Sequence, residues 1–140
     1  MKKCSKIISI LLLTAIIFSL ASCDSLYLNS YSAIGFRTKK LGNECSASFT
    51  QLNGTYVFKM KYRGSEDKIY YAADVESGTV VIYYDSVGVK EQLFTAEGGY
   101  PIEGNTGYVD RGTVYIILEA KNAKNGSIKV RLGGEGAFTN

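Results

Sequence analysis

Apolar and polar residues alternate along most of the chain from residue 32 onward. The clearest run is residues 55–63, whose even-numbered positions are aromatic or methionine and whose odd-numbered positions are mostly basic. A period of two is what a half-buried β-strand requires, because successive side chains point to opposite faces of the sheet. The same alternation predicts further strands at residues 33–38, 46–51, 68–75, 79–85, 89–95, 112–120 and 127–132.

Short polar or glycine-containing segments separate these runs, for example residues 76–78, 85–88 and 121–126. Such segments between alternating runs are typical of antiparallel hairpins. About eight short strands therefore predict an all-β domain over residues 32–132, an antiparallel two-sheet β-sandwich of jelly-roll-like form. A closed barrel is the alternative, and the single apolar face of most strands favours the sandwich. The run 112–120 is apolar on nearly both faces, which predicts a central strand covered on both sides.

Residues 97–107 interrupt the alternation, because they contain four glycines and the single proline of the chain. They are predicted to form the longest loop. Tyr100 and Tyr108 lie in or beside it, and Asp110 and Arg111 follow. Rigid aromatic rings next to hydrogen-bonding side chains are typical of loops that bind a glycan or a protein, so these four residues are the candidate binding residues. The alternative is a loop whose tyrosines pack against one end of the sandwich.

The first 23 residues follow a different pattern. Three lysines precede an apolar run over residues 7–20. Ala21, Ser22 and Cys23 follow this run directly. A basic start, a short apolar run and small residues predict a cleaved, helical signal peptide over residues 1–22. The alternatives are an uncleaved membrane helix, for which the run falls short of the ~20 residues needed, and an ordinary secretory signal that Cys23 follows by chance.

The sequence Leu20-Ala21-Ser22-Cys23 resembles the lipobox of bacterial lipoproteins, in which signal peptidase II cleaves before a cysteine that carries diacylglycerol. The resemblance implies lipidation of Cys23, with acyl chains as the covalent group and no other cofactor. It places the chain on the outer face of the cytoplasmic membrane, with the bilayer as a partner. Residues 23–31 are then the lipidated N-terminus and a short tether, and residues 133–140 are predicted to be a flexible tail.

Processing changes the charge and the cysteine content. The chain has 16 Lys and Arg against 13 Asp and Glu, and three of its lysines lie in the predicted signal peptide, so the mature chain carries 13 of each. A neutral domain lacks the basic surface of a nucleic-acid binder, and no nucleic-acid partner is expected. Acylation of Cys23 and removal of Cys4 leave Cys45 as a single thiol, predicted to be partly buried.

The side chains that most enzymes use are scarce. The chain has no histidine, which excludes Ser-His-Asp and Cys-His catalysis. Most carboxylates lie in predicted turns, where Asp and Glu are common for local backbone reasons. No metal site is predicted, although calcium binding by turn carboxylates such as Glu103 with Asp110 stays open. The outward basic residues of two strands (Lys59, Lys61, Arg63, Lys129 and Arg131) are expected to form a solvated sheet face.

Four segments carry a second resemblance, namely residues 49–60, 75–80, 112–118 and 124–130. Together they resemble small bacterial lipoproteins with one β-sandwich domain and, more distantly, the pre-peptidase C-terminal domains of secreted enzymes. The resemblance covers residues 46–132 and implies a fold without a catalytic motif. The sequence thus predicts a non-catalytic module that binds a cell-envelope glycan or protein. A carboxylate-dependent hydrolase and a structural envelope component are the alternatives.

Overall fold

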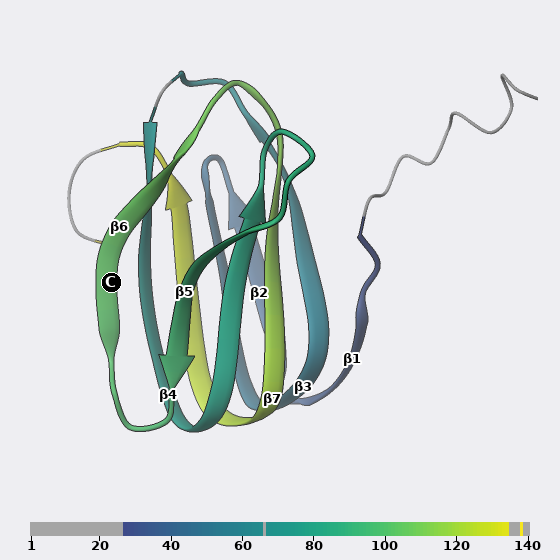
Figure 1. Cartoon of the computed structure of the whole chain (residues 1–140). Coiled ribbons are helices and arrows are strands. Elements are labelled where there is room, and N and C mark those ends of the chain that lie inside the picture. The colour runs from purple at the N-terminus through teal and green to yellow at the C-terminus, as the bar shows by residue number, and fades with distance from the viewer. Residues whose placement is uncertain (1–26, 66, 135–137, 139–140) are drawn as a thin grey trace, which may run out of the picture.

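The computed structural model describes residues 27–65, 67–134 and 138. Seven strands occupy most of this part (Figure 1): β1 (Ser30–Ile34), β2 (Arg37–Leu41), β3 (Glu44–Tyr62), β4 (Asp67–Asp85), β5 (Glu91–Glu97), β6 (Ile102–Val109) and β7 (Gly112–Leu132). No helix in the described residues is long and apolar enough to cross a bilayer. The predicted signal peptide and Cys23 lie outside the described residues, as do five positions of the predicted tail.

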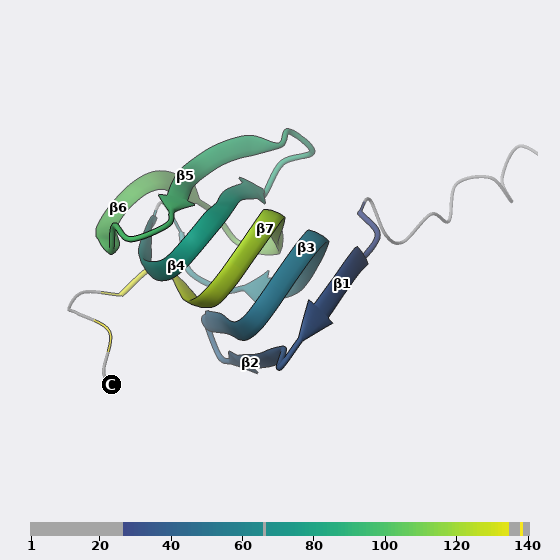
Figure 2. The same cartoon turned by 90° about the horizontal axis from the view of Figure 1, so that it is seen from below.

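The strands pair antiparallel as one sheet that folds back on itself. Its order is β1-β3-β7-β4-β5, with β2 also paired to β3 and β6 also paired to β4. Figure 1 shows the long strands β3, β4 and β7 turning round at the lower end of the molecule, and Figure 2 shows β1, β3, β7 and β4 side by side. The result is the predicted antiparallel β-sandwich.

The bends divide each long strand between two layers. Layer A contains β2, β6 and residues 44–52, 67–77 and 123–132, as the pairing of these segments shows. Layer B contains β5 and residues 54–62, 79–85 and 112–120. β1 runs beside the bend of β3, pairing Ser30 with Thr55 and Ile34 with Gln51.

Two predicted hairpin turns are in fact bends within continuous strands. The segments 76–78 and 121–126 were expected to reverse the chain, but they lie inside β4 and β7. Gly78 has a φ of +80°, and a Cβ there would lie 2.2 Å from the backbone oxygen of Asn122. The pairing of β4 with β7 also shifts register between Ser77 and Thr79. A bulge with a left-handed glycine bends a strand sharply while its pairing continues, and it needs the same residues as a turn.

The predicted loop 97–107 is wrong for most of its length, because residues 102–107 belong to β6. Two tyrosine side chains approach the glycines of this strand closely. A Cβ at Gly104 would lie 2.8 Å from the hydroxyl oxygen of Tyr71, and one at Gly107 would lie 2.9 Å from that of Tyr84. The glycines that hid this strand from the sequence pattern therefore let it lie across two aromatic side chains.

The core lies between the two layers and follows the predicted alternation. Layer A contributes side chains such as Ile69, Val75 and Val130, and layer B contributes side chains such as Ile82 and Ile116, all with at most 1% exposure. The run 112–120 is covered on both sides, as predicted, because Ile117 on the outer face of layer B is 1% exposed. Cys45 is a free thiol with 1% exposure, and burial raises its pKa.

Candidate functional site

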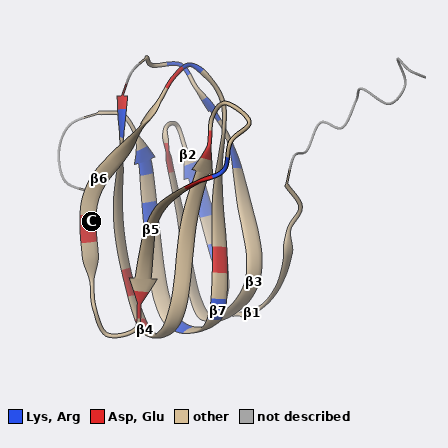
Figure 3. Cartoon of the chain, viewed as in Figure 1, with Lys and Arg blue, Asp and Glu red and all other residues tan. Residues whose placement is uncertain are grey.

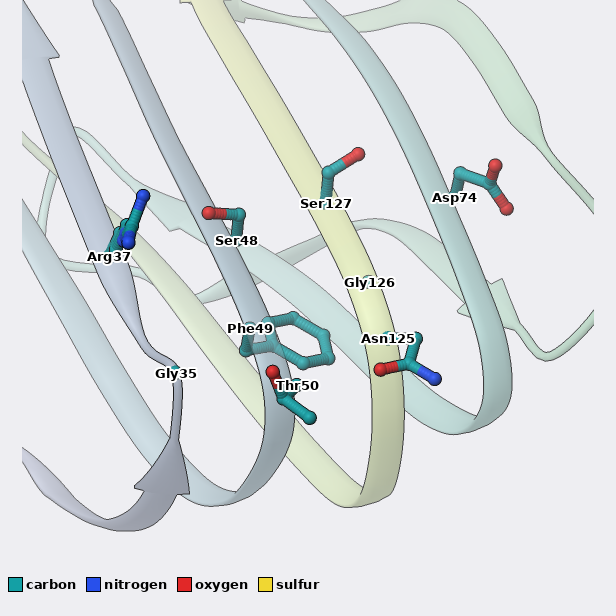
Figure 4. Close-up of a pocket in the computed structure, with 9 residues that line it drawn as sticks. All are labelled: Gly35, Arg37, Ser48, Phe49, Thr50, Asp74, Asn125, Gly126 and Ser127. Carbon is teal, nitrogen blue, oxygen red and sulfur yellow. The ribbon is translucent and has the colours of Figure 1, made fainter.

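The outer face of layer A carries a row of four side chains from four neighbouring strands. Arg37 on β2 pairs with Ser48 on β3, Ser48 pairs with Ser127 on β7, and Ser127 pairs with Asp74 on β4. Figure 4 shows these four side chains next to one another across the sheet. Since paired strands lie about 4.8 Å apart, the row is about 14 Å long and ends in a cation on one side and an anion on the other.

The surface along this row is hollowed. A depression of about 510 Å³ lies over the four residues and continues to Thr50 and Asn125. A second depression, of about 520 Å³, lies between Asp74, Glu103 and Lys129. A third, of about 270 Å³, lies between Lys39, Ser46 and Lys129. Ser127 lines all three, so the three depressions adjoin one another around this residue. We call the three together the Ser127 groove, and its residues are Arg37, Lys39, Ser46, Ser48, Ala72, Asp74, Glu103, Ser127 and Lys129.

Small residues together with Lys129 make the floor of the Ser127 groove, and charged residues make its rims. Ser46, Ser48, Ala72 and Ser127 lie in the middle strands, where longer side chains would fill the space. The rim on β2 is basic and the rim on β4 and β6 is acidic (Figure 3). The groove therefore offers hydroxyl groups along its floor and charged donors and acceptors along its sides.

An aromatic cluster follows the groove along the same face. Tyr70 on β4 pairs with Arg131 on β7, one step beyond the row that contains Lys129. The Arg131 guanidinium carbon lies 5.3 Å from the ring centre of Tyr70 and 5.0 Å from that of Phe138. Phe138 also lines the 520 Å³ depression. Cation–π contacts of this kind hold a ring at a fixed place, so a half-buried apolar surface stands next to the polar floor.

The four candidate binding residues are separated by the length of β6. Tyr100 lies in the turn before β6, at the bent end of the sandwich, where the amide of Gly99 donates to the carbonyl of Val75 at 2.7 Å. Tyr108, Asp110 and Arg111 lie at the other end of β6 and in the step into β7. Tyr100 and Tyr108 are 75% and 66% exposed. They do not form one site.

Asp110 and Arg111 face the connection between β3 and β4. Arg111 Nε donates to the carbonyl oxygen of Arg63 at 3.2 Å, and Ser65 Oγ donates to Asp110 Oδ1 at 3.5 Å. These contacts hold two neighbouring connections together at one end of the sandwich. A binding role for Tyr108, Asp110 and Arg111 stays a prediction. Tyr100 is followed in this turn by Pro101, which lines the 520 Å³ depression.

Acidic residues do not gather into a metal-binding cluster in the described part of the chain. No group of three or more His, Cys, Asp or Glu side chains is placed there to hold a metal ion. Glu103 and Asp110, which the sequence left open as a calcium pair, stand near opposite ends of β6. Seven residues of strand separate them by about 23 Å, so they cannot share one ion.

The Ser127 groove was not predicted from the sequence, because its residues are brought together by the order of the strands in the sheet. Residues 46–51 and 127–132 were both predicted as strands, and their outward serines and lysines were visible in the alternation. Nothing in the pattern shows that β7 lies between β3 and β4. The predicted basic face is also divided, because Lys129 and Arg131 lie on layer A whereas Lys59 and Lys61 lie on layer B. The signal available was a set of small outward residues on several strands.

Comparisons with known proteins find likeness among solved structures. No family model matches the chain, and no curated protein matches it. A complex of TmCBM61 with β-1,4-galactotriose is similar with a TM-score of 0.47 and 12% identity, over 76% of this chain and 88% of that one. A carbohydrate-binding module from Cellvibrio mixtus lichenase 5A in complex with cellotriose has a TM-score of 0.41 and 15% identity, over 77% and 92%. A family 29 carbohydrate-binding module has a TM-score of 0.39 and 15% identity, over 74% and 76%.

Proposed function

We propose that the chain is an exported lipoprotein, attached to the membrane through Cys23, whose domain binds a cell-envelope glycan in the Ser127 groove. The observation that carries the proposal is the row from Arg37 through Ser48 and Ser127 to Asp74. The attachment is supported by the cysteine that directly follows Leu20, Ala21 and Ser22. The protein acts by binding and does not transform its ligand.

The chemistry of the groove suits a sugar chain better than a protein. A sugar ring has hydroxyl groups at its edge and an apolar C–H face, so it needs hydrogen-bonding side chains beside a flat apolar surface. The serine floor and charged rims supply the first, and the aromatic cluster beside the groove, whose Phe138 lines the 520 Å³ depression, supplies the second. Protein-binding surfaces instead centre on exposed aromatic and aliphatic side chains. Among the described residues, none of the large exposed apolar side chains lines the groove.

The acidic rim supports binding and not hydrolysis. Asp74 and Glu103 line the same depression, as the two carboxylates of a glycosidase would. Both side chains are exposed on an open sheet face, however, whereas the two carboxylates of a glycosidase flank the scissile bond of the bound sugar. We therefore assign Asp74 and Glu103 as hydrogen-bond acceptors for sugar hydroxyls. Release of reducing ends that is lost in Asp74→Asn or Glu103→Gln would contradict this assignment.

Isothermal titration calorimetry with short oligosaccharides tests the proposal. The probes are N-acetylglucosamine oligomers, peptidoglycan fragments, and mannan and galactan oligosaccharides. We expect at least one probe to bind the wild type, and Ser127→Trp to weaken it by about tenfold or more, because an indole fills the floor of the groove. Ser30→Trp is the matched control, since Ser30 is also an exposed strand serine but lies on β1. No binding by any probe, or equal binding by Ser127→Trp, would contradict the proposal.

A further inference from the structure

One buried carboxylate joins the start of the described chain to the connection between β4 and β5. Asp85, at the end of β4, is 2% exposed. Its Oδ2 accepts a hydrogen bond from the Tyr27 hydroxyl at 2.7 Å. Its Oδ1 accepts from the amides of Val87 at 3.1 Å and Gly88 at 2.6 Å. A buried charge with three donors is well satisfied, so Asp85 fixes both segments in one place.

Two further contacts hold the same segment against layer B. The Tyr27 ring packs edge-to-face on Tyr115 of β7, with 5.3 Å between the ring centres. The side-chain oxygen of Asn29 accepts from the amide of Val57 on β3 at 2.7 Å. Residues 27 and 29 are therefore part of the folded domain, although both fall in the predicted tether 23–31. The effective tether is what precedes Tyr27.

That remaining tether is very short. Three residues separate Cys23 from Tyr27 in the sequence. Since an extended chain spans at most about 3.6 Å per residue, Cys23 cannot lie farther than about 14 Å from Tyr27. A lipid on Cys23 would hold the Tyr27 corner of the domain close to the membrane surface.

Exposed apolar side chains gather at this corner. Val87 is 80% exposed and Val89 is 57% exposed, both in the connection that Asp85 holds. Leu28, next to Tyr27, is 76% exposed. Figures 1 and 2 both show the β4–β5 connection and the start of the described chain at the same corner of the sandwich. The Ser127 groove lies on layer A, the opposite side of the sandwich.

We infer that Leu28, Val87 and Val89 enter the head-group region of the bilayer that carries the lipid of Cys23, so that the Ser127 groove faces away from the membrane. The inference rests on the lipid attachment in the proposed function. A single short tether would leave the domain free to roll, whereas a second, apolar contact beside it fixes the orientation. The groove is then open to a glycan that extends outward from the membrane.

Tryptophan fluorescence tests the inference, because the chain contains no tryptophan of its own. Full-length Val87→Trp is made in a host that lipidates exported proteins, and its lipid is checked by intact mass. The protein is placed in phosphatidylethanolamine and phosphatidylglycerol vesicles with brominated acyl chains. We expect Val87→Trp to lose about half of its fluorescence relative to vesicles without bromine. Tyr100→Trp is the matched control, with a native side chain 75% exposed at the other end of the sandwich, and should keep its fluorescence.

Adding Val89→Asp to Val87→Trp should restore most of the lost fluorescence while the lipid is retained, because a carboxylate resists entry into the bilayer. Equal quenching of Val87→Trp and Tyr100→Trp would overturn the inference, as would a wild type without lipid on Cys23. The glycan titration on the same preparations is a separate readout. Quenching at Val87→Trp without any glycan binding would contradict the binding role of the groove and leave the orientation intact.

Discussion

The two outer faces of the sandwich are built from the same three strands, yet they carry different side chains. On layer A the outward positions of β7 are Ser127, Lys129 and Arg131, and the surface is hollowed. On layer B they are Tyr115, Ile117 and Glu119, and Tyr27 packs against the first of them. One face is open and polar, and the other is partly covered by the chain's own N-terminal segment.

The outward side chains of each layer match their surroundings: they are polar where the face is open and partly apolar where other residues cover it. Ile117 is 1% exposed although it points away from the core between the layers. Lys90 places its ammonium 4.1 Å from the ring centre of Tyr83 and forms an ion pair with Glu119, which adds to the cover on layer B. No comparable layer of described residues lies over Ser127. Because a bend divides each long strand between the two layers, the two halves of the strand can carry outward side chains of different kinds.

The largest expected effect comes from breaking the bend that separates the two faces. Gly78→Ala should lower the free energy of unfolding by about 4 kcal/mol, because its Cβ would overlap the Asn122 backbone at a left-handed φ. Urea unfolding measures the loss. Gly88→Ala is the matched control, since Gly88 has a φ of +87° but no atom within 4 Å of the added Cβ. It should cost about 1 kcal/mol, and equal losses would show that the bend is not tightly packed.

The next effect removes the carboxylate that holds the cover of layer B. Asp85→Ala should lower the free energy of unfolding by about 2–3 kcal/mol, because the Tyr27 hydroxyl and two amides lose their acceptor. Asp74→Ala, at an exposed aspartate in the groove, should change it by less than about 0.5 kcal/mol. Thermal or urea unfolding of both variants decides the matter. A similar loss of unfolding free energy in both variants would mean that the Asp85 carboxylate holds the cover of layer B no more strongly than an exposed aspartate would.

Alkaline pH should loosen the covered face. Burial raises the pKa of Tyr27 from 10.0 to about 12, and both the hydrogen bond to Asp85 and the negative charge of Asp85 contribute to this increase. Burial and Asp67 raise the pKa of Tyr62 to about 12 as well. The unfolded chain then loses these protons first, so stability is complete below about pH 10 and falls as the pH rises towards about 12.

Tyr27→Phe separates the contribution of Tyr27 from that of Tyr62. The variant should be less stable than the wild type by about 1 kcal/mol at about pH 9, because the hydrogen bond to Asp85 is lost. Its stability should also fall less steeply with pH, since one raised pKa is gone. Urea unfolding at a series of pH values measures both. A slope equal to that of the wild type would show that Tyr27 does not titrate in this range.

The smallest expected effect concerns the rim of layer B. Glu119→Gln breaks the ion pair between Glu119 and Lys90. The Lys90 side chain is 34% exposed and that of Glu119 is 38% exposed. Exposed pairs contribute little, so the free energy of unfolding should fall by about 0.5 kcal/mol or less. High salt should remove the difference between the variant and the wild type. A loss above about 1 kcal/mol would mean that this pair is a main part of the cover on layer B.

The alternation predicted the fold class and most of the inward side chains. Residues such as Ile69 and Ile82 were correctly placed inside, because burial on one face imposes a period of two wherever the strand lies. Two predicted turns were wrong, since Ser77-Gly78 and Asn125-Gly126 fit a turn as well as a bend within a strand. β6 was missed, because its glycines accommodate tyrosines from another strand. Both errors concern contacts between segments, which local pattern does not contain.

The candidate site was predictable to a smaller extent. Tyr100 and Tyr108 are exposed, as a binding role would need, but the strand between them places them at opposite ends of the molecule. The Ser127 groove depends on which strands are neighbours and on the bends that expose the outward half of β7. A serine such as Ser127 is ordinary in sequence, and it becomes part of a groove floor only because β7 lies between Ser48 on β3 and Asp74 on β4.

The most direct test of the groove is amide chemical-shift mapping of the isotope-labelled protein with the oligosaccharide that binds in calorimetry. We expect the amide resonances of Ser48, Ser127 and Lys129 to shift on titration, while those of Tyr115 and Ile117 on layer B stay unchanged. Shifts confined to Tyr108, Asp110 and Arg111, or to layer B, would contradict the assignment of the Ser127 groove as the binding site.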